Sequence, residues 1–353
     1  MFKLLSFLSP LIGAERAHNA TVLLLRLLGK IPCAKWLMRK IYAVEDPSLE
    51  RDVFGIHFRN PIGMAAGFDR HGEIFRELGA LGFGFVEIGT ITPEPQDGNP
   101  KPRMFRLDSD QAIINRIGLN SQGLEQAVAN LRSDHSGVII GCNICKNSAT
   151  EPEKAPHDYL RVFRNLYQYA DYFTVNVSYN SSSKQYVPRT RESIISILNP
   201  LFDFRRGQNQ YRPILLKISP DLSNEDIDMM TDIMLETPLD GIVATNGTIR
   251  HSGLVTEPEQ LKRYGAGAVS GKPLSERSIE VVRRIYERSN GTYPIIGVGG
   301  IMTPKQAKAM LEAGATLVQI YTGYVYNGPN FVGDICRELM VQQTEPTEPT
   351  EQQ

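Results

Sequence analysis

The sequence predicts an α/β protein built around a closed (β/α)8 TIM barrel. Eight short runs rich in β-branched and aromatic residues recur along the chain, and segments with helical periodicity separate them. Strands that alternate with helices form parallel sheets, and eight such repeats favour a barrel over an open sheet. The chain of 353 residues has room for one such barrel, which takes about 250 residues, and for additional segments.

The composition is that of an ordinary globular protein and excludes several other classes. Hydrophobic residues make up 41% of the chain and charged residues 22%, so neither a disordered nor a collagen-like chain is expected. The formal net charge of -1 gives no overall field that would attract nucleic acid. The four cysteines are too few for a disulfide framework, and the Cys142-x-x-Cys145 pair has no second pair of ligands, so we expect no metal site.

Residues 1–45 are interpreted as a separate N-terminal helical region. Its apolar stretches are interrupted by Pro10 and by charged residues before either reaches the roughly 18 residues that a membrane crossing needs. Two short helices that are apolar on one side and basic elsewhere are typical of an element that lies in a membrane interface. A helical cap packed on the barrel explains the same pattern, and the two interpretations are compatible.

The barrel is expected to span residues 46–343. Its strands are predicted at residues 61–66, 83–90, 137–143, 172–178, 213–219, 240–246, 294–299 and 317–323. Apolar residues recur on one face of the segments between them, which predicts helices at 223–235, 274–288 and 304–313 among others.

Two segments do not fit the strand and helix alternation. Residues 91–117 are too long for an ordinary loop and too rich in Pro and Gly for a helix, so we expect an excursion over one end of the barrel. Residues 344–353 continue a Thr-Glu-Pro repeat and have nothing apolar to bury, which predicts a disordered tail.

Polar residues gather where the predicted strands end, which is where such barrels place their active sites. The third to sixth strands contribute Asn143, Asn176, Lys217, Thr245 and Asn246. Asn commonly caps a following helix, so any one of these residues has a purely structural explanation. Their occurrence at successive strand ends instead indicates a donor-rich pocket for a planar ligand with many acceptors.

A phosphate group is expected at the ends of the seventh and eighth strands. Residues 297–300 read Gly-Val-Gly-Gly after the seventh strand, and residues 321–323 read Tyr-Thr-Gly after the eighth. Barrels often hold a phosphate there on backbone N–H groups, and glycine lets the backbone approach the anion. Residues 265–271 are expected to form a flexible loop that could close over the same group.

Seven segments carry a resemblance to a known family. They are Glu-Arg-Ala-His at 15–18, Asn-Pro-Ile-Gly-Met-Ala-Ala-Gly-Phe-Asp at 60–69, Gly-Phe-Gly-Phe-Val-Glu-Ile-Gly-Thr at 82–90, Lys-Pro-Arg-Met-Phe-Arg at 101–106, Asn-Arg-Ile-Gly at 115–118, Asp-Gly-Ile-Val-Ala-Thr-Asn at 240–246 and Pro-Ile-Ile-Gly-Val-Gly-Gly at 294–300. With them, residues 15–340 resemble the class 2, quinone-linked dihydroorotate dehydrogenases of pyrimidine synthesis. The resemblance implies a (β/α)8 barrel with an N-terminal helical hairpin that dips into a membrane and admits quinone to FMN.

The resemblance also implies an FMN site, and every matching position carries a suitable residue type. These positions are Ala66, Gly67, Thr90, Asn143, Asn176, Lys217, Thr245, Gly271, Gly300, Tyr321 and Thr322. His18 and Arg103 stand where the family lines its quinone access path, and Tyr321 adjoins it. A cation such as Lys217 beside the pyrimidine edge of the flavin stabilises the anionic reduced form.

The substrate side departs from the family pattern. Class 2 enzymes carry Asn-x-Ser-Ser-Pro-Asn-Thr after the fourth strand, and its second serine is the base. Residues 176–182 of this chain read Asn-Val-Ser-Tyr-Asn-Ser-Ser, so Tyr179 stands in the place of that serine. A phenol with a pKa of about 10 can act as acid or base. Three further positions are changed and three substrate-binding positions persist: Ser181, Arg70 and Gly247 are replacements, and Asn115, Asn176 and Asn246 are retained.

The resemblance therefore implies an FMN-dependent oxidoreductase that oxidises (S)-dihydroorotate to orotate, or acts on a related small polar substrate, and passes electrons to a quinone. Two alternatives stay open: a divergent paralogue with a different CH–CH substrate and Tyr179 as acid or base, and a catalytically inactive flavin-binding protein at a membrane. Cys145 as the base, in the manner of class 1 relatives, is disfavoured because this family has glycine there. We expect peripheral attachment to the cytoplasmic side of a bacterial inner membrane and no nucleic-acid partner.

Overall fold

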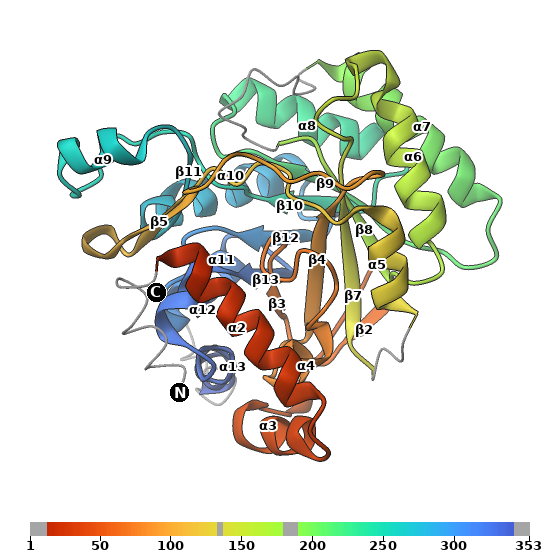
Figure 1. The fold of residues 1–353 in the computed structure, drawn as a ribbon. Coiled ribbons are helices and arrows are strands. Elements are labelled where there is room, and N and C mark those ends of the chain that lie inside the picture. Colours follow the sequence, from red (N-terminus) through yellow and green to blue (C-terminus); the bar gives the residue numbers. More distant parts are fainter. Residues whose placement is uncertain (1–12, 133–136, 179–189, 342–353) are drawn as a thin grey trace, which may run out of the picture.

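A closed barrel of eight parallel strands forms the centre of the computed structural model, which describes residues 13–132, 137–178 and 190–341 (Figure 1). The strands follow one another around the barrel as β3 (Ile62–Met64), β4 (Phe85–Ile91), β7 (Ile139–Ile144), β8 (Tyr172–Asn176), β9 (Ile214–Ile218), β10 (Gly241–Ala244), β12 (Ile295–Val298) and β13 (Leu317–Ile320). The pairing of β13 with β3 closes the ring. Each predicted strand overlaps one of these eight, so the (β/α)8 prediction is confirmed.

Helices follow the strands and cover the outside of the barrel. They are α4 (Phe75–Ala80), α5 (Gly123–Leu131), α6 (Ala155–Leu166), α7 (Arg191–Arg206), α8 (Asn224–Glu236), α10 (Ser275–Arg288), α11 (Pro304–Glu312), α12 (Thr322–Asn327) and α13 (Phe331–Val341). α7 and α11 begin with capping boxes on Thr190 and Thr303, which satisfy backbone N–H groups that the first turn leaves unpaired. The three helices predicted by residue range are confirmed to within one residue at each end.

The amino-terminal end of the barrel interior is filled by apolar side chains. Phe85 and Tyr172 are fully buried there. Phe58 of the antiparallel pair β1 (Arg51–Val53) and β2 (Ile56–Phe58) packs edge-on against Phe85, with ring centroids 5.3 Å apart. The base of the barrel is therefore filled, and its functional site belongs at the carboxyl ends of the strands.

The predicted excursion between the second and third barrel strands contains a hairpin. Its strands, β5 (Met104–Leu107) and β6 (Ala112–Asn115), form a three-stranded antiparallel sheet with β11 (Ala268–Gly271), next to α9 (Pro258–Tyr264). The prediction of a flexible loop at 265–271 is therefore wrong for its second half. That segment becomes a strand because its pairing partner lies far away in the sequence, so local glycine content is a poor guide.

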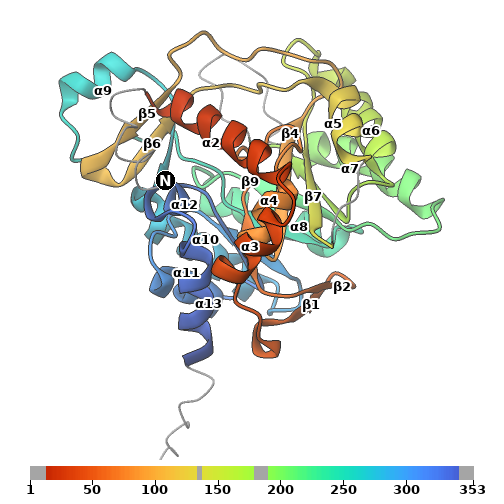
Figure 2. The ribbon, with the colours of Figure 1, turned by 60° about the horizontal axis from the view of Figure 1, so that its bottom comes forward.

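The described part of the N-terminal region, from residue 13 onward, forms two helices. Figure 2 shows α2 (Ala14–Gly29) crossing the outside of the barrel and α3 (Ala34–Tyr42) beside α4. None of the helices in the described ranges is long and apolar enough to cross a membrane. The predicted tail at 344–353 lies outside the described residues.

Candidate active site

Two cavities with polar residues in their walls meet at the carboxyl ends of the barrel strands. Their volumes are about 150 Å³ and about 130 Å³. The residues that line both are Ala66, Gly67, Asn115, Lys217, Asn246 and Ala268. Because they share this wall, we describe them as two halves of one site, the strand-end site.

The residues of the predicted FMN site come together here. The half of about 130 Å³ is lined by Ala66, Gly67, Lys217, Thr245, Gly271, Gly300, Tyr321 and Thr322. Thr90 and Asn176 line the half of about 150 Å³. Asn143 lies behind that wall and bonds to both of these side chains.

The predicted substrate residues lie in the half of about 150 Å³. Arg70, Asn115, Asn176 and Asn246 all line it. Tyr179 and Ser181 lie outside the described residues, so their placement stays a prediction from the sequence.

A chain of hydrogen bonds fixes the side-chain amides of the site. The Oδ1 atom of Asn143 accepts from Thr90 Oγ1 at 2.6 Å and from Asn176 Nδ2 at 3.2 Å. Asn176 Oδ1 in turn accepts from the backbone N–H of Ser178 at 3.1 Å, and Asn246 Nδ2 donates to the carbonyl oxygen of Ser178 at 3.1 Å. The ends of β8 and β10 are thereby tied together, and each amide has a defined donor and acceptor end.

Gly300, at the proposed phosphate position, has no room for a side chain. Its φ of 74° lies in the left-handed region, and a Cβ atom there would be 2.3 Å from the backbone nitrogen of Ser275. Ser275 begins α10 and its hydroxyl donates to the carbonyl oxygen of Gly300 at 2.6 Å. Across the cavity the hydroxyls of Ser270 and Thr322 are 2.8 Å apart. Exposed backbone N–H groups and hydroxyls at a helix start are suited to a phosphate.

Lys217 is a buried cation between the two halves of the site. It is 4% exposed and lines both of them. Burial lowers the pKa of its ammonium group, and the carboxylate of Glu87 acts in the opposite direction. A buried cation at this place can interact with an electron-rich ligand, because little solvent competes.

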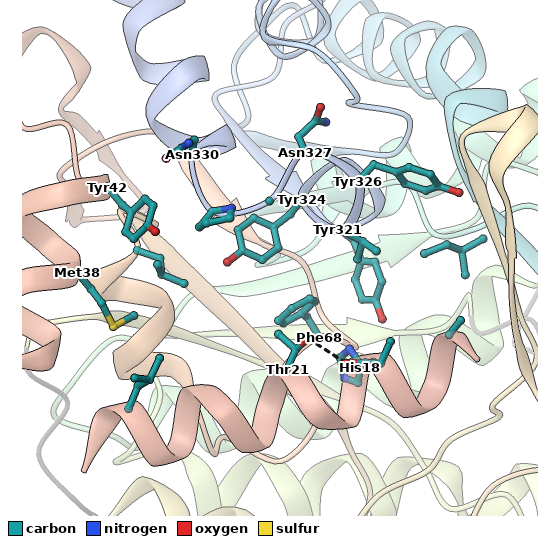
Figure 3. Close-up of a pocket in the computed structure, with 18 of the residues that line it drawn as sticks. His18, Thr21, Met38, Tyr42, Phe68, Tyr321, Tyr324, Tyr326, Asn327 and Asn330 are labelled. Carbon is teal, nitrogen blue, oxygen red and sulfur yellow. Dashed lines mark hydrogen bonds between the residues drawn. The ribbon is translucent and has the colours of Figure 1, made fainter. Parts of the chain in front are cut away.

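An apolar cavity of about 490 Å³ lies next to the strand-end site. Figure 3 shows His18 and Thr21 of α2, Met38 and Tyr42 of α3, and the aromatic rings of Phe68, Tyr321 and Tyr324 around it. Tyr321 lines both this cavity and the strand-end site. One aromatic side chain therefore separates an apolar compartment from a polar one.

His18 sits at the wall of the apolar cavity. Its ring packs edge-on against Phe68, with centroids 5.0 Å apart, and donates a hydrogen bond to the Phe68 backbone (Figure 3). Burial and the nearby guanidinium of Arg70 together lower the pKa of the imidazole from 6.5 to about 3. The ring is therefore neutral at neutral pH.

Arg103, which is predicted to line the quinone access path, lies close to His18 of α2. It is not among the described residues that line the apolar cavity, and it lines a polar cavity of about 330 Å³ together with His18. Its guanidinium donates to Glu15 Oε1 at 2.9 Å and to the carbonyl oxygens of Asp97 and Asn99. The arginine therefore ties α2 to the excursion.

Comparison with known proteins identifies the family. A family model for dihydroorotate dehydrogenase matches residues 48–342. The chain belongs to the dihydroorotate dehydrogenase family.

Relatives in the dihydroorotate dehydrogenase family match almost the whole chain. The dihydroorotate dehydrogenase (quinone) of Christiangramia forsetii is 45% identical over 326 residues, which cover 92% of this chain and 94% of that protein. The protein of the same name from Nocardia farcinica is 42% identical over 339 residues, which cover 96% and 92%.

Solved dihydroorotate dehydrogenase structures have the same fold. The Eimeria tenella enzyme in complex with ferulenol superposes with a TM-score of 0.85 at 32% identity, covering 96% of this chain and 95% of that one. Its ligand-free form gives a TM-score of 0.84 at 33% identity, covering 94% and 96%.

The sequence reasoning missed the polar residues behind the site. Glu87 and Gln319 are fully buried inside the barrel, and Ser178 links two site asparagines. The signal for Glu87 was present, because an acid inside a buried apolar strand needs hydrogen-bond partners. Cys145 is buried, bonds to the Tyr159 hydroxyl at 3.3 Å and has a pKa raised by burial to about 11, which argues against it as a base.

Proposed function

We propose that this protein is an FMN-dependent oxidoreductase that converts (S)-dihydroorotate to orotate and passes the electrons to a quinone. One observation carries the proposal: Tyr321 lines both the half of the strand-end site that is proposed to hold FMN and the apolar cavity. A site suited to FMN and a site suited to a quinone therefore lie on two sides of one residue. The curated relatives named dihydroorotate dehydrogenase (quinone) support the same reaction.

The residues of the strand-end site fit FMN. Gly300 and Thr322 offer a phosphate position, and Lys217 offers a cation. The buried Oε1 atom of Gln319 has no hydrogen-bond partner among the described residues and is an acceptor available to a ligand N–H group. Bound FMN would supply a two-electron acceptor, which no side chain provides.

The remaining polar groups are proposed to bind and orient the substrate. The amides of Asn115, Asn176 and Asn246 can donate to and accept from a planar pyrimidine ring. The Nη2 atom of Arg70 is buried without a hydrogen-bond partner among the described residues. Its planar guanidinium is suited to a carboxylate, because two parallel N–H groups can bind both oxygens.

Tyr179 is proposed as the proton-transfer residue, on the sequence alone. The oxidation removes a proton from one ring carbon, so a base must lie within hydrogen-bond reach of it. In Tyr179→Phe we expect substrate-dependent bleaching of the flavin absorbance to slow by about 100-fold or more, with FMN still bound. Stopped-flow absorbance measures the rate, and an unchanged rate would remove Tyr179 from the mechanism.

A related substrate is the second candidate. The residue types Tyr179, Ser181, Arg70 and Gly247 differ from those that the family carries at the matching positions, which favours a different substrate. Anaerobic mixing of the FMN-loaded protein with dihydroorotate tests the assignment. Bleaching of the flavin supports dihydroorotate, whereas bleaching only with another dihydropyrimidine supports a shifted substrate. If the protein binds FMN but no dihydropyrimidine reduces it, the result supports an inactive flavin-binding protein.

The helices α2 and α3 are proposed to rest on a membrane surface and to admit quinone to the apolar cavity. Large apolar side chains are exposed on and between them, namely Leu23, Leu27, Ile31, Trp36, Leu37 and Ile41. Basic residues accompany them, namely Arg26, Lys30, Lys35, Arg39 and Lys40. This combination suits the headgroup region of an anionic bilayer, and the proposed location is the cytoplasmic face of a bacterial inner membrane.

Vesicle binding tests this contact. In the double variant Trp36→Ser with Ile41→Ser, co-sedimentation with anionic phospholipid vesicles should weaken by about 10-fold or more, because the apolar surface available for burial is lost. Tyr211→Ser is a matched control, because Tyr211 is 59% exposed but lies outside the two helices. Equal binding by all three proteins contradicts a docking role for α2 and α3.

A further inference from the structure

The barrel interior holds a carboxylate that the proposed reaction does not use. Glu87 of β4 is fully buried, just below the strand-end site. Its Oε1 accepts from Asn143 Nδ2 at 2.8 Å, and its Oε2 accepts from Gln319 Nε2 at 2.7 Å, from Thr174 Oγ1 at 3.1 Å and from the Tyr172 hydroxyl at 3.2 Å. The side chains that bond to Glu87 therefore come from β7, β8 and β13. Lys217 adds a fourth neighbouring strand, β9.

The carboxylate decides which end of each amide faces the ligand. An ionised carboxylate can only accept, so Asn143 and Gln319 must turn their NH2 groups towards Glu87. The Oδ1 of Asn143 is then the atom that accepts from Thr90 and Asn176. The Oε1 of Gln319 is likewise left as a buried acceptor in a side chain that lines the strand-end site.

The same carboxylate is the anion that opposes the burial of Lys217. A buried ammonium group loses its hydration and is destabilised unless an opposite charge lies nearby. Glu87 shifts the pKa of Lys217 upward, against the effect of burial. The apolar base of the barrel, with Phe85 and Tyr172, limits solvent that would otherwise screen the two charges.

We propose that Glu87 is a positioning residue of the flavin site, which holds the amides of Asn143 and Gln319 in the orientation that a flavin requires and supplies a counter-charge to Lys217. The inference rests on the proposed function, because it assumes that FMN occupies the strand-end site. Glu87 acts through these three side chains and not by contact with the reacting atoms.

The substitution Glu87→Gln tests the proposal because it removes the charge and keeps the shape. One amide cannot accept from all four donors, and Lys217 loses its counter-charge. We expect FMN binding, measured by the quenching of FMN fluorescence, to weaken by about 10-fold or more. NMR titration of the Lys217 side chain should show that its ammonium loses its proton at lower pH than in the unaltered protein. Glu87→Asp keeps the charge and should recover part of the FMN affinity.

Asp240→Asn is the matched control. Asp240 is a partly buried, hydrogen-bonded carboxylate, and it accepts from Arg205 at 2.5 Å and from the backbone N–H of Ile214 at 2.8 Å. It lies just before β10, at the opposite end of the barrel from the strand-end site. This variant should lose stability but keep the FMN affinity of the unaltered protein. FMN affinity and Lys217 titration that are unchanged in Glu87→Gln would overturn the proposal.

A double variant covers the case in which Glu87→Gln alone does not fold. Lys217→Met leaves the Glu87 anion without its cation and should lower the thermal unfolding midpoint. Adding Glu87→Gln to it should raise that midpoint again, because both buried charges are then gone. Additive losses in the double variant would contradict the charge coupling. If the unaltered protein fails to bind FMN, the proposed function fails; if it binds FMN and Glu87→Gln changes nothing, only this inference fails.

Discussion

The imidazole of His18 is held neutral by its surroundings. Burial and the guanidinium of Arg70 lower its pKa to about 3, and its ring donates to the backbone of Phe68. A neutral ring that donates through one nitrogen keeps the other as an acceptor. At the wall of the apolar cavity, such an acceptor suits the hydroxyl group of a reduced quinone.

This pKa shift predicts part of the acid sensitivity of the fold. The folded-state pKa lies below the ordinary value of 6.5, so the contribution of His18 to stability is present above about pH 6.5 and is lost as the pH falls towards 3. Between about pH 6 and pH 4, the free energy of unfolding of His18→Gln should fall less steeply than that of the unaltered protein, by up to about 1.4 kcal/mol per pH unit. Urea unfolding at a series of pH values measures both slopes.

His71 titrates in an overlapping range and should keep part of the slope in both proteins. Burial lowers its pKa from 6.5 to about 4. The effect of His18 is therefore the difference between two curves of unfolding free energy against pH, one for the unaltered protein and one for His18→Gln. Parallel curves would show that His18 is not buried as a neutral ring.

The sequence predicts the contact residues of the site better than the residues behind them. Lys217, Thr245 and Asn246 stand at strand ends, so the barrel topology alone brings them together. Glu87 lies in the middle of its strand, and only the closed barrel reveals that side chains from other strands converge on it. The ion pair of Arg103 with Glu15 could not be predicted either, because a linear pattern does not determine how α2 docks on the excursion.

At the scale of elements, α2 is attached to the barrel by a nearly buried ion pair. The side chains of Arg103 and Glu15 are 7% and 12% exposed. A second pair, between Arg26 and Glu73, also links α2 to the barrel, but the Arg26 side chain is 47% exposed. Solvent weakens exposed pairs, whereas removal of one partner of a buried pair leaves an uncompensated charge.

The two ion pairs predict different responses to neutralisation. Glu15→Gln should raise the hydrogen-exchange rates of the α2 amides by about 10-fold or more, because Arg103 is left charged without its carboxylate. Arg26→Gln, the matched control, should change them by no more than about 5-fold. Hydrogen exchange read by mass spectrometry on peptides of α2 measures both. Equal responses would mean that α2 is held by its apolar face alone.

The sequence predicted those helices and strands whose pattern lies within one continuous segment of the chain. The eight barrel strands are buried on both faces, so they appear in the sequence as continuous apolar runs. The strand β11 was not predictable, because the residues 265–271 contain several glycines and the strand exists only by pairing with β6. Hairpin β5–β6 was likewise predicted only as an excursion.

At the scale of the whole molecule, the amino-terminal end of the barrel is filled and the carboxyl end carries the cavities. Apolar side chains fill the base, and three adjoining cavities, namely the two halves of the strand-end site and the apolar cavity, lie around the strand ends, α2 and Tyr321. A ligand bound there contacts many strands at once. Its binding free energy therefore adds to the stability of the entire barrel.

FMN should accordingly stabilise the folded protein in a concentration-dependent way. Free FMN at about 100 times its dissociation constant adds about 2.7 kcal/mol to the free energy of unfolding. For a protein of this size the thermal unfolding midpoint should rise by several degrees, which differential scanning fluorimetry of FMN-stripped protein measures. Riboflavin lacks the phosphate and should stabilise less. If FMN leaves the unfolding midpoint unchanged, FMN does not bind to the strand-end site.

The pairings of β13 with β3 and of β11 with β6 have a consequence for folding. Both join strands that are far apart in the sequence, so a long loop must close before either pairing can form. Closing a long loop costs conformational entropy, which makes such pairings slow to form. While the ring is open, β3 and β13 each present an unpaired edge that another chain can pair with, so the open barrel is prone to aggregation.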